Sequence, residues 1–144
     1  MSDYLWLFYA LLSALAAALV SVFAKIGLQG FDPNAATVIR ALIMAAFLVL
    51  IMCLQQNFSE VLNIFSHKKA LLFIVLSGIA GASSWLFYFL ALKYGKVAQV
   101  ASVDKFSVVL ATLIALIFLG ETISWVAGLG VGFITLGILL VALG

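Results

Sequence analysis

Five long apolar runs decide what this chain can fold into. The hydrocarbon layer of a bilayer is about 30 Å thick, and an α-helix needs roughly 20 apolar residues to cross it. The runs cover residues 4–24, 35–54, 70–92, 98–119 and 124–143, with short breaks between them. Because 67% of the 144 residues are hydrophobic and only 8% are charged, a normal water-facing surface is excluded. The sequence predicts a multi-pass membrane protein.

The composition also favours helices over strands. Leu, Ala, Ile, Val and Phe dominate the runs and the chain has one proline, whereas a membrane barrel would show short segments of alternating polarity. We therefore predict an all-α integral membrane fold with five transmembrane helices in a single domain, residues 1–144. The longest break spaces Phe58, Val61, Leu62 and Phe65 as i, i+3, i+4 and i+7, which predicts a short helix in the membrane interface.

Several classes of function are excluded by what the sequence lacks. It has one cysteine and one histidine, so no metal-ligand cluster or Ser/His/Asp set is expected, and we predict neither a cofactor nor an enzyme. The seven Lys and Arg residues are scattered and give a net charge of only +2, so nucleic acid is not an expected partner.

Asp104 and Lys105 stand together inside the fourth run, where charges are costly and by default mark a functional site. Adjacent helical residues point about 100° apart, so we expect each to find a partner elsewhere, such as Arg40 or Lys25 for the aspartate, or water or substrate. Ser107 extends the polar face by one turn. One interpretation is that the pair fixes helix register or dimer geometry by buried ion pairing. The other is that Asp104 exchanges a proton while Lys105 or Arg40 contacts an anionic group.

Arg40 lies more than one turn inside the second run. It is either a structural anchor that reaches the interface, or a binding or gating cation. Trp85 and Tyr88 lie near the end of the third run, where an aromatic belt is common. Alternatively, they form a cage around a cationic or aromatic substrate.

The last run has small residues and a turn that bear on packing. Gly128 and Gly132 are four residues apart and predict a packing face, either within the bundle or between subunits. We expect the carboxylate of Glu121 to favour the N-terminus of the last helix, with Thr122 or Ser124 as a possible cap.

The loop charges leave the orientation in the membrane open. One side carries Lys68 and Lys69, and the other carries Lys25, Lys93 and Lys96. Two against three is almost no bias under the positive-inside rule, so insertion in both orientations is expected to be possible.

Three stretches, "DPNAATVIR" (32–40), "WLFYFLALKYGKVAQVASVDK" (85–105) and "IFLGETISWVAGLGVGFITLGILLV" (117–141), resemble the EamA domain of the drug/metabolite transporter superfamily. Pro33 and Arg40 match its proline shortly before an arginine, and residues 119–121 match its Leu-Gly-Glu turn. The resemblance implies a five-span half of an inverted-repeat, ten-helix transporter. Most members carry two such domains, and they commonly have a proline near the position of Asp104 and Lys105.

The resemblance implies a secondary transporter of a small metabolite or drug-like molecule in the inner cell membrane, working by alternating access. With one half present and balanced loop charges, we predict an antiparallel homodimer of dual topology, coupled to protons or another ion. Asp104 would carry the proton, Lys105 and Arg40 would orient substrate, and Trp85 and Tyr88 would shape the cavity. The alternative is a non-transporting small subunit that packs onto another membrane protein and stabilises it.

Overall fold

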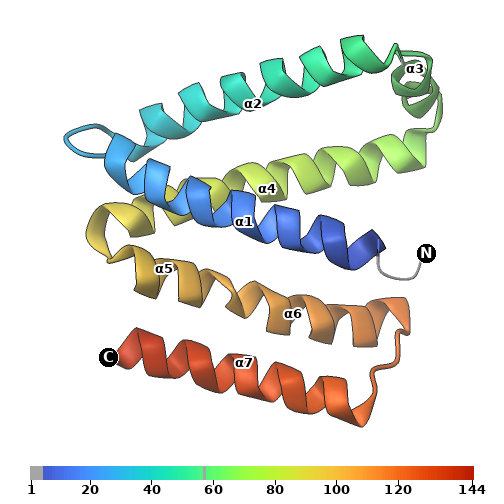
Figure 1. Cartoon of the computed structure of the whole chain (residues 1–144). Coiled ribbons are helices and arrows are strands. Elements are labelled where there is room, and N and C mark those ends of the chain that lie inside the picture. The colour runs from blue at the N-terminus through green and yellow to red at the C-terminus, as the bar shows by residue number, and fades with distance from the viewer. Residues whose placement is uncertain (1–4, 57) are drawn as a thin grey trace. The chain divides into compact units, whose positions relative to one another are not determined.

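The computed structural model describes residues 5–56 and 58–144, most of which are helical, with no strand among them (Figure 1). The elements are α1 (Leu5–Gly27), α2 (Pro33–Gln55), α3 (Phe58–Ser66), α4 (Lys68–Tyr94), α5 (Val97–Asp104), α6 (Phe106–Ile114), the π-helical turn η1 (Ala115–Leu119) and α7 (Trp125–Leu143). With α5, α6 and η1 counted as one span, five helices are long and apolar enough to cross a membrane. The prediction of an all-α, five-span fold is confirmed. Residue 4, the first of the predicted spans, lies outside the described residues.

The chain divides into two compact units. One contains residues 1–25 and 94–144, and therefore α1 with α5, α6, η1 and α7. The other contains residues 26–93, and therefore α2, α3 and α4. This division assigns Asp104, Lys105 and Ser107 to the first unit, and Arg40, Trp85 and Tyr88 to the second.

The second unit is a pair of long helices joined through α3. Asp32 caps α2 by accepting a hydrogen bond at Oδ2 from the Ala35 amide at 3.0 Å, and Pro33 occupies the first helical position, where its missing N–H costs nothing. The helix ends at Gln55, and the capping residue Gln56 adopts the left-handed conformation at φ 53°. The predicted short helix after α2 is present as α3, and it reverses the chain so that α2 and α4 run antiparallel.

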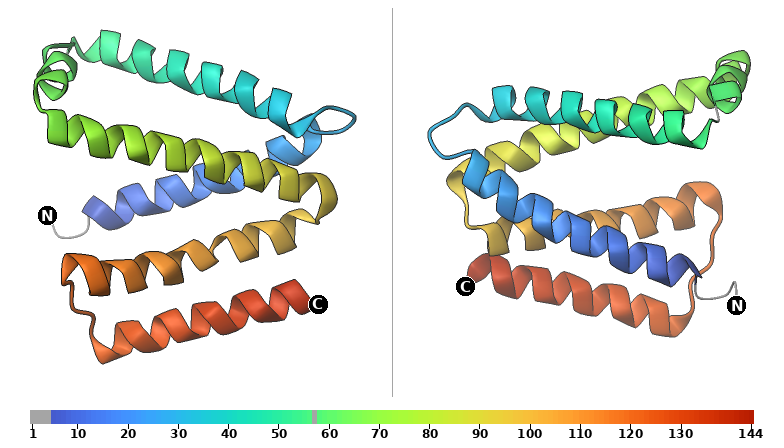
Figure 2. Two further views of the ribbon diagram at one scale, coloured as in Figure 1. Left: turned by 180° about the vertical axis from the view of Figure 1, so that it is seen from behind. Right: turned by 45° about the horizontal axis from the view of Figure 1, so that its top comes forward.

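In the first unit, α5 and α6 pack against α7, and the views in Figures 1 and 2 agree on this arrangement. The residues of α7 with least exposure follow helical spacing along one face and include Val131, Thr135 and Ile138. Ser124 begins this helix: its Oγ accepts a hydrogen bond from the Ala127 amide at 3.2 Å. The prediction that Glu121 caps this helix is wrong. Its side chain lies before the capping residue and makes no hydrogen bond or ion pair with the described residues.

The fourth span, predicted as one continuous helix, is interrupted at Lys105. Its backbone, at φ −68° and ψ −8°, forms a tight turn in which the Lys105 amide donates to Ser102 O at 3.1 Å and the Val108 amide donates to Lys105 O at 3.0 Å. The span then closes with η1 and with Gly120, whose φ of 68° suits a residue without a Cβ. The predicted site pair Asp104 and Lys105 therefore lies at a break in the span.

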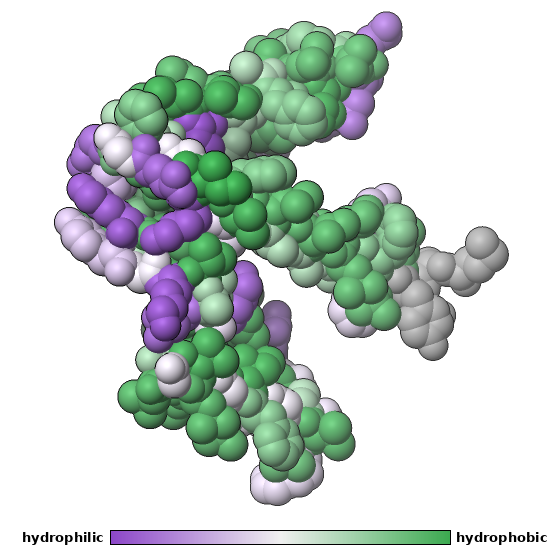
Figure 3. All heavy atoms as spheres, turned by 60° about the vertical axis from the view of Figure 1, so that its left-hand side comes forward, coloured by the Kyte–Doolittle hydropathy of each residue, from purple (hydrophilic) through white to green (hydrophobic). Residues whose placement is uncertain are grey.

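Apolar side chains cover the outside of the helices. In the most hydrophobic stretch of each span, at most 6% of the residues are buried. Figure 3 shows the hydrophobic colour along the helices and hydrophilic residues near helix ends and connections. A surface of this kind is stable against lipid tails and not against water.

Candidate functional site

Arg40 of α2 stacks on an aromatic side chain of α4. Its guanidinium carbon lies 3.4 Å from the centroid of the Trp85 ring and 5.4 Å from that of Phe89. A guanidinium over an indole face is attracted by the negative potential of the ring, and the attraction is larger where water is excluded. Trp85 and Tyr88 were predicted as an alternative to form a cage around a cationic substrate. In the structure, the Arg40 guanidinium already occupies the face of Trp85.

Three rings form the surface that receives Arg40. Trp85, Tyr88 and Phe89, called here the aromatic cluster, are spaced i, i+3 and i+4 and therefore share one face of α4. Trp85 meets Tyr88 edge to face at 5.6 Å between centroids, and meets Phe89 at 6.0 Å. Tyr88 and Phe89 are buried. Edge-to-face packing of this kind fixes the ring planes, so the Trp85 face is held ready for a planar cation.

The guanidinium contacts a ring that lies well inside the second helix of its unit, rather than extending toward a helix end. Arg40 is the eighth residue of α2, about 10 Å from its start, and Trp85 lies about 13 Å from the end of α4 on the same side. Stacking on Trp85 therefore holds the charge inside the span. This geometry favours the interpretation of Arg40 as a functional cation over that of an interfacial anchor.

Asp104 and Lys105 contact each other, which corrects the expectation that neighbouring side chains would not pair. Lys105 Nζ lies 3.5 Å from Asp104 Oδ2. The expectation considered only the directions in which the two side chains leave the helix, whereas the long Lys105 side chain can curve back so that its end meets Asp104. The Asp104 side chain is 35% exposed and that of Lys105 57%, so the pair is neither a buried ion pair nor tightly bonded.

Ser107, the remaining predicted site residue, lies exposed in the first turn of α6 and makes no hydrogen bond through its side chain with the described residues. Its unit holds Asp104 and Lys105 as well, while the other unit brings Arg40, Trp85 and Tyr88 together. Among the described residues, no group of three or more His, Cys, Asp or Glu side chains is placed to hold a metal ion.

Two features of these units were missed by sequence reasoning. Phe89 belongs to the aromatic cluster, and its position four residues after Trp85 was a signal that could have found it. Lys25, at the end of α1, donates a hydrogen bond from Nζ to Gly95 O at 2.8 Å. Nothing in the local pattern indicates that long-range bond, because the partner is a backbone carbonyl 70 residues away.

The helices and their lipid-facing surface define a multi-pass helical membrane protein, and comparison with known proteins narrows the class. Residues 4–143 match the EamA-like transporter family, and the chain belongs to that family. It is similar to the "Uncharacterized transporter in cobO 3'region" of Sinorhizobium sp., at 41% identity over 137 residues that cover 95% of this chain and 96% of the relative. No solved structure matches the chain significantly. The chain is thus a membrane transporter, and the predicted resemblance to the EamA domain is confirmed.

Proposed function

We propose that this transporter is a secondary carrier of a small metabolite or drug-like molecule, exchanging its substrate for protons by alternating access as an antiparallel homodimer in the inner cell membrane. No cofactor takes part in this scheme. Asp104 binds and releases the proton, and the position of the Lys105 ammonium changes with the protonation of Asp104.

The observation that carries the proposal is the contact of Asp104 with Lys105 inside a span that has no other charged residue. A carboxylate there is costly to keep unless its charge is used or compensated. When a proton binds Asp104, the attraction at 3.5 Å is lost and the Lys105 ammonium is free to move toward an anionic group. When the proton leaves, the pair forms again, so protonation and the position of Lys105 change together.

The break between α5 and α6 supports alternating access. It lies about 12 Å into a span of 23 residues, which places it in the middle third of the helix. Interrupted helices are common near the binding sites of transporters, since a small backbone change there redirects half of a span. The proposed proton site and the break in the helix then coincide.

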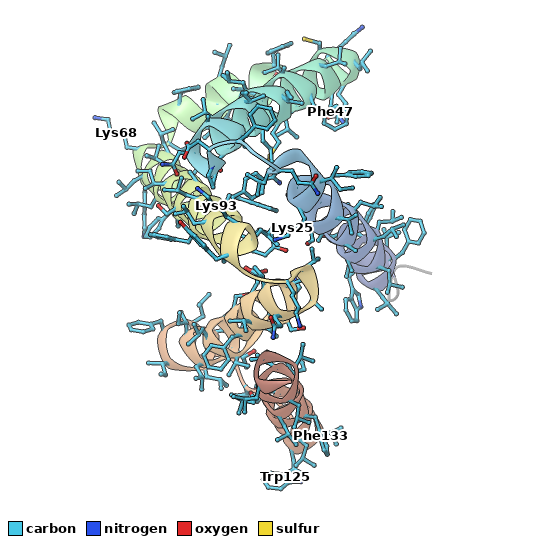
Figure 4. All side chains as sticks on the ribbon, turned by 90° about the vertical axis from the view of Figure 1, so that its left-hand side faces the viewer. Lys25, Phe47, Lys68, Lys93, Trp125 and Phe133 are labelled. Atoms are coloured by element: carbon cyan, nitrogen blue, oxygen red, sulfur yellow. The ribbon has the colours of Figure 1, made fainter. Side chains whose placement is uncertain are left out.

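The outward face of α7 supports a second copy. A shallow groove runs along it, lined by Trp125, Gly128, Leu129, Gly132, Phe133 and Leu136. A Cβ placed on Gly132 would meet no atom within 4 Å. Figure 4 shows Trp125 and Phe133 pointing away from α5 and α6. The packing face was predicted from Gly128 and Gly132. At Gly132 no other part of the described chain packs against it, as expected if a second subunit packs there.

The proposal is tested with the purified protein alone in liposomes that contain a pH-sensitive dye. Pools of small metabolites are added outside, and proton movement is followed in the presence of an imposed pH gradient. We expect a pool-dependent proton flux that Asp104→Asn reduces at least tenfold, because an amide cannot bind the proton. Asp32→Asn is the matched control, since asparagine also caps helices and should leave the flux intact.

Two results would count against this function. An Asp104→Asn variant that is folded and carries normal proton flux removes Asp104 from the mechanism. A wild-type protein that moves nothing alone, but co-purifies stoichiometrically with another membrane protein, supports the alternative of a stabilising subunit.

A further inference from the structure

The second unit contains a positive charge that nothing in it neutralises. Its described acidic residues are Asp32, which precedes α2, and Glu60 in α3. Neither long helix of this unit contains an Asp or Glu, and Arg40 makes no ion pair or hydrogen bond with any described residue. The guanidinium is half-buried in a span, where a cation without a counter-ion is unfavourable. Within this unit, the guanidinium is therefore available to an anion that the unit itself does not supply.

The way Arg40 is held determines which anion it suits. Trp85 covers one face of the guanidinium, and stacking leaves the N–H groups, which lie in the plane, available at its edge. Two parallel N–H donors match the two oxygens of a carboxylate, which gives both strength and direction. The aromatic cluster beside them offers apolar area for the rest of the same molecule.

We propose that Arg40 and the aromatic cluster form the subsite for an organic carboxylate with an apolar or aromatic body, and that this is the substrate class of the transporter. The proposal rests on the transport function above and narrows its substrate. Arg40 binds the carboxylate, and Trp85 and Phe89 position Arg40 and contact the body of the molecule. An organic cation is disfavoured because the guanidinium already occupies the indole face and would repel it.

An anionic lipid supplies a similar oxygen pair in its phosphate, so the experiment must separate the two sources. The full chain is prepared with Trp6→Phe and Trp125→Phe, which leaves Trp85 as the single tryptophan. Both replaced side chains are strongly exposed, at 68% and 82%. Fluorescence of Trp85 then reports directly on the ring that carries Arg40.

The probes are benzoate, benzamide and benzamidine, which share a planar phenyl body and differ in charge. We expect benzoate to change Trp85 fluorescence saturably at neutral pH, with an apparent Kd at least tenfold lower than that of either other probe. Arg40→Gln should abolish the benzoate response, and Arg40→Lys should weaken it at least fivefold, because an ammonium cannot form the bidentate pair. Lys69→Gln, which removes an exposed charge of the same unit, is the matched control and should bind normally.

Equal responses to benzoate and benzamide, or tighter binding of benzamidine, overturn the proposal. So does a benzoate response that appears in neutral detergent and disappears in nanodiscs containing phosphatidylglycerol, since Arg40 would then serve a lipid phosphate. If Arg40→Gln fails to fold, a Trp85→Phe variant that retains Trp125 replaces it. Its binding of radiolabelled benzoate is measured by equilibrium dialysis and compared with that of the native protein, and we expect weaker binding by the variant. If the protein with native Arg40 does not bind benzoate but its proton flux depends on Asp104, this inference alone is refuted. If it binds benzoate through Arg40 but its proton flux does not depend on Asp104, the proton mechanism alone is refuted.

Discussion

At the scale of single residues, the two units handle a charge inside a span in different ways. Arg40 is stabilised by the faces of Trp85 and Phe89, which leaves its N–H donors unused. Asp104 instead contacts its neighbour Lys105 at a point where both side chains remain partly exposed. The first arrangement suits capture of an anion, and the second suits a charge that is gained and lost.

The cap of the last helix gives a prediction at this scale. Ser124→Ala removes the acceptor of the Ala127 amide, so we expect the free energy of unfolding to fall by about 1 kcal/mol. Glu121→Gln should change it by less than about 0.5 kcal/mol, because that side chain makes no hydrogen bond or ion pair with the described residues. Denaturant titration followed by circular dichroism in detergent measures both. A larger loss for Glu121→Gln would restore the capping role first expected for it.

The residues of the candidate site could be named from the sequence, but their pairing could not. A charge in a run of apolar residues is visible without a structure, as Arg40, Asp104 and Lys105 show. Their contacts depend on geometry that the pattern does not contain: the side-chain conformations of Asp104 and Lys105 bring the ends of an adjacent pair together, and the antiparallel placement of α2 and α4 brings Arg40 to Trp85. The aromatic cluster follows from helical spacing once Trp85 is chosen.

At the scale of helices, the length of the apolar runs was sufficient to predict the membrane spans. It was not sufficient to predict where a span is interrupted. Each predicted run corresponds to a long helix, because a membrane imposes both the length and the apolar composition. The break between α5 and α6 has no proline or glycine at residues 104–106, so the usual signals of an interrupted helix are absent. The π-helical turn η1 also has no signal in the sequence that would have predicted it.

The groove on α7 gives a prediction at this scale. Gly132→Leu places a large side chain in the groove and should weaken self-association at least tenfold if a second copy packs there. Gly130→Leu is the matched control: Gly130 is also exposed, has no atom within 4 Å of a built Cβ, and points about 160° away around the helix. Förster transfer between labelled copies in liposomes measures the association. Equal effects of the two substitutions would assign the interface to another helix.

At the scale of the whole molecule, the balance of charge across the membrane is the property that decides how a five-span chain could form a transporter. Consecutive spans place Lys25, Lys93 and Lys96 on one side and Lys68 and Lys69 on the other. An inverted-repeat transporter needs two halves of opposite orientation. One chain can supply both only if its loop charges let it insert either way.

This balance predicts dual topology, which a pair of reporters fused after Gly144 can measure, one active only in the cytoplasm and one only outside it. We expect signals of comparable size from both at low expression, because a difference of one lysine between the two sides is a weak orienting force. Thr122→Lys and Asn34→Lys add one charge to opposite sides and should shift the ratio in opposite directions. Since both positions are exposed, the substitutions should not disturb packing within the chain. A signal from one side alone, unmoved by either lysine, would mean that all copies share one orientation. The antiparallel homodimer would then be wrong.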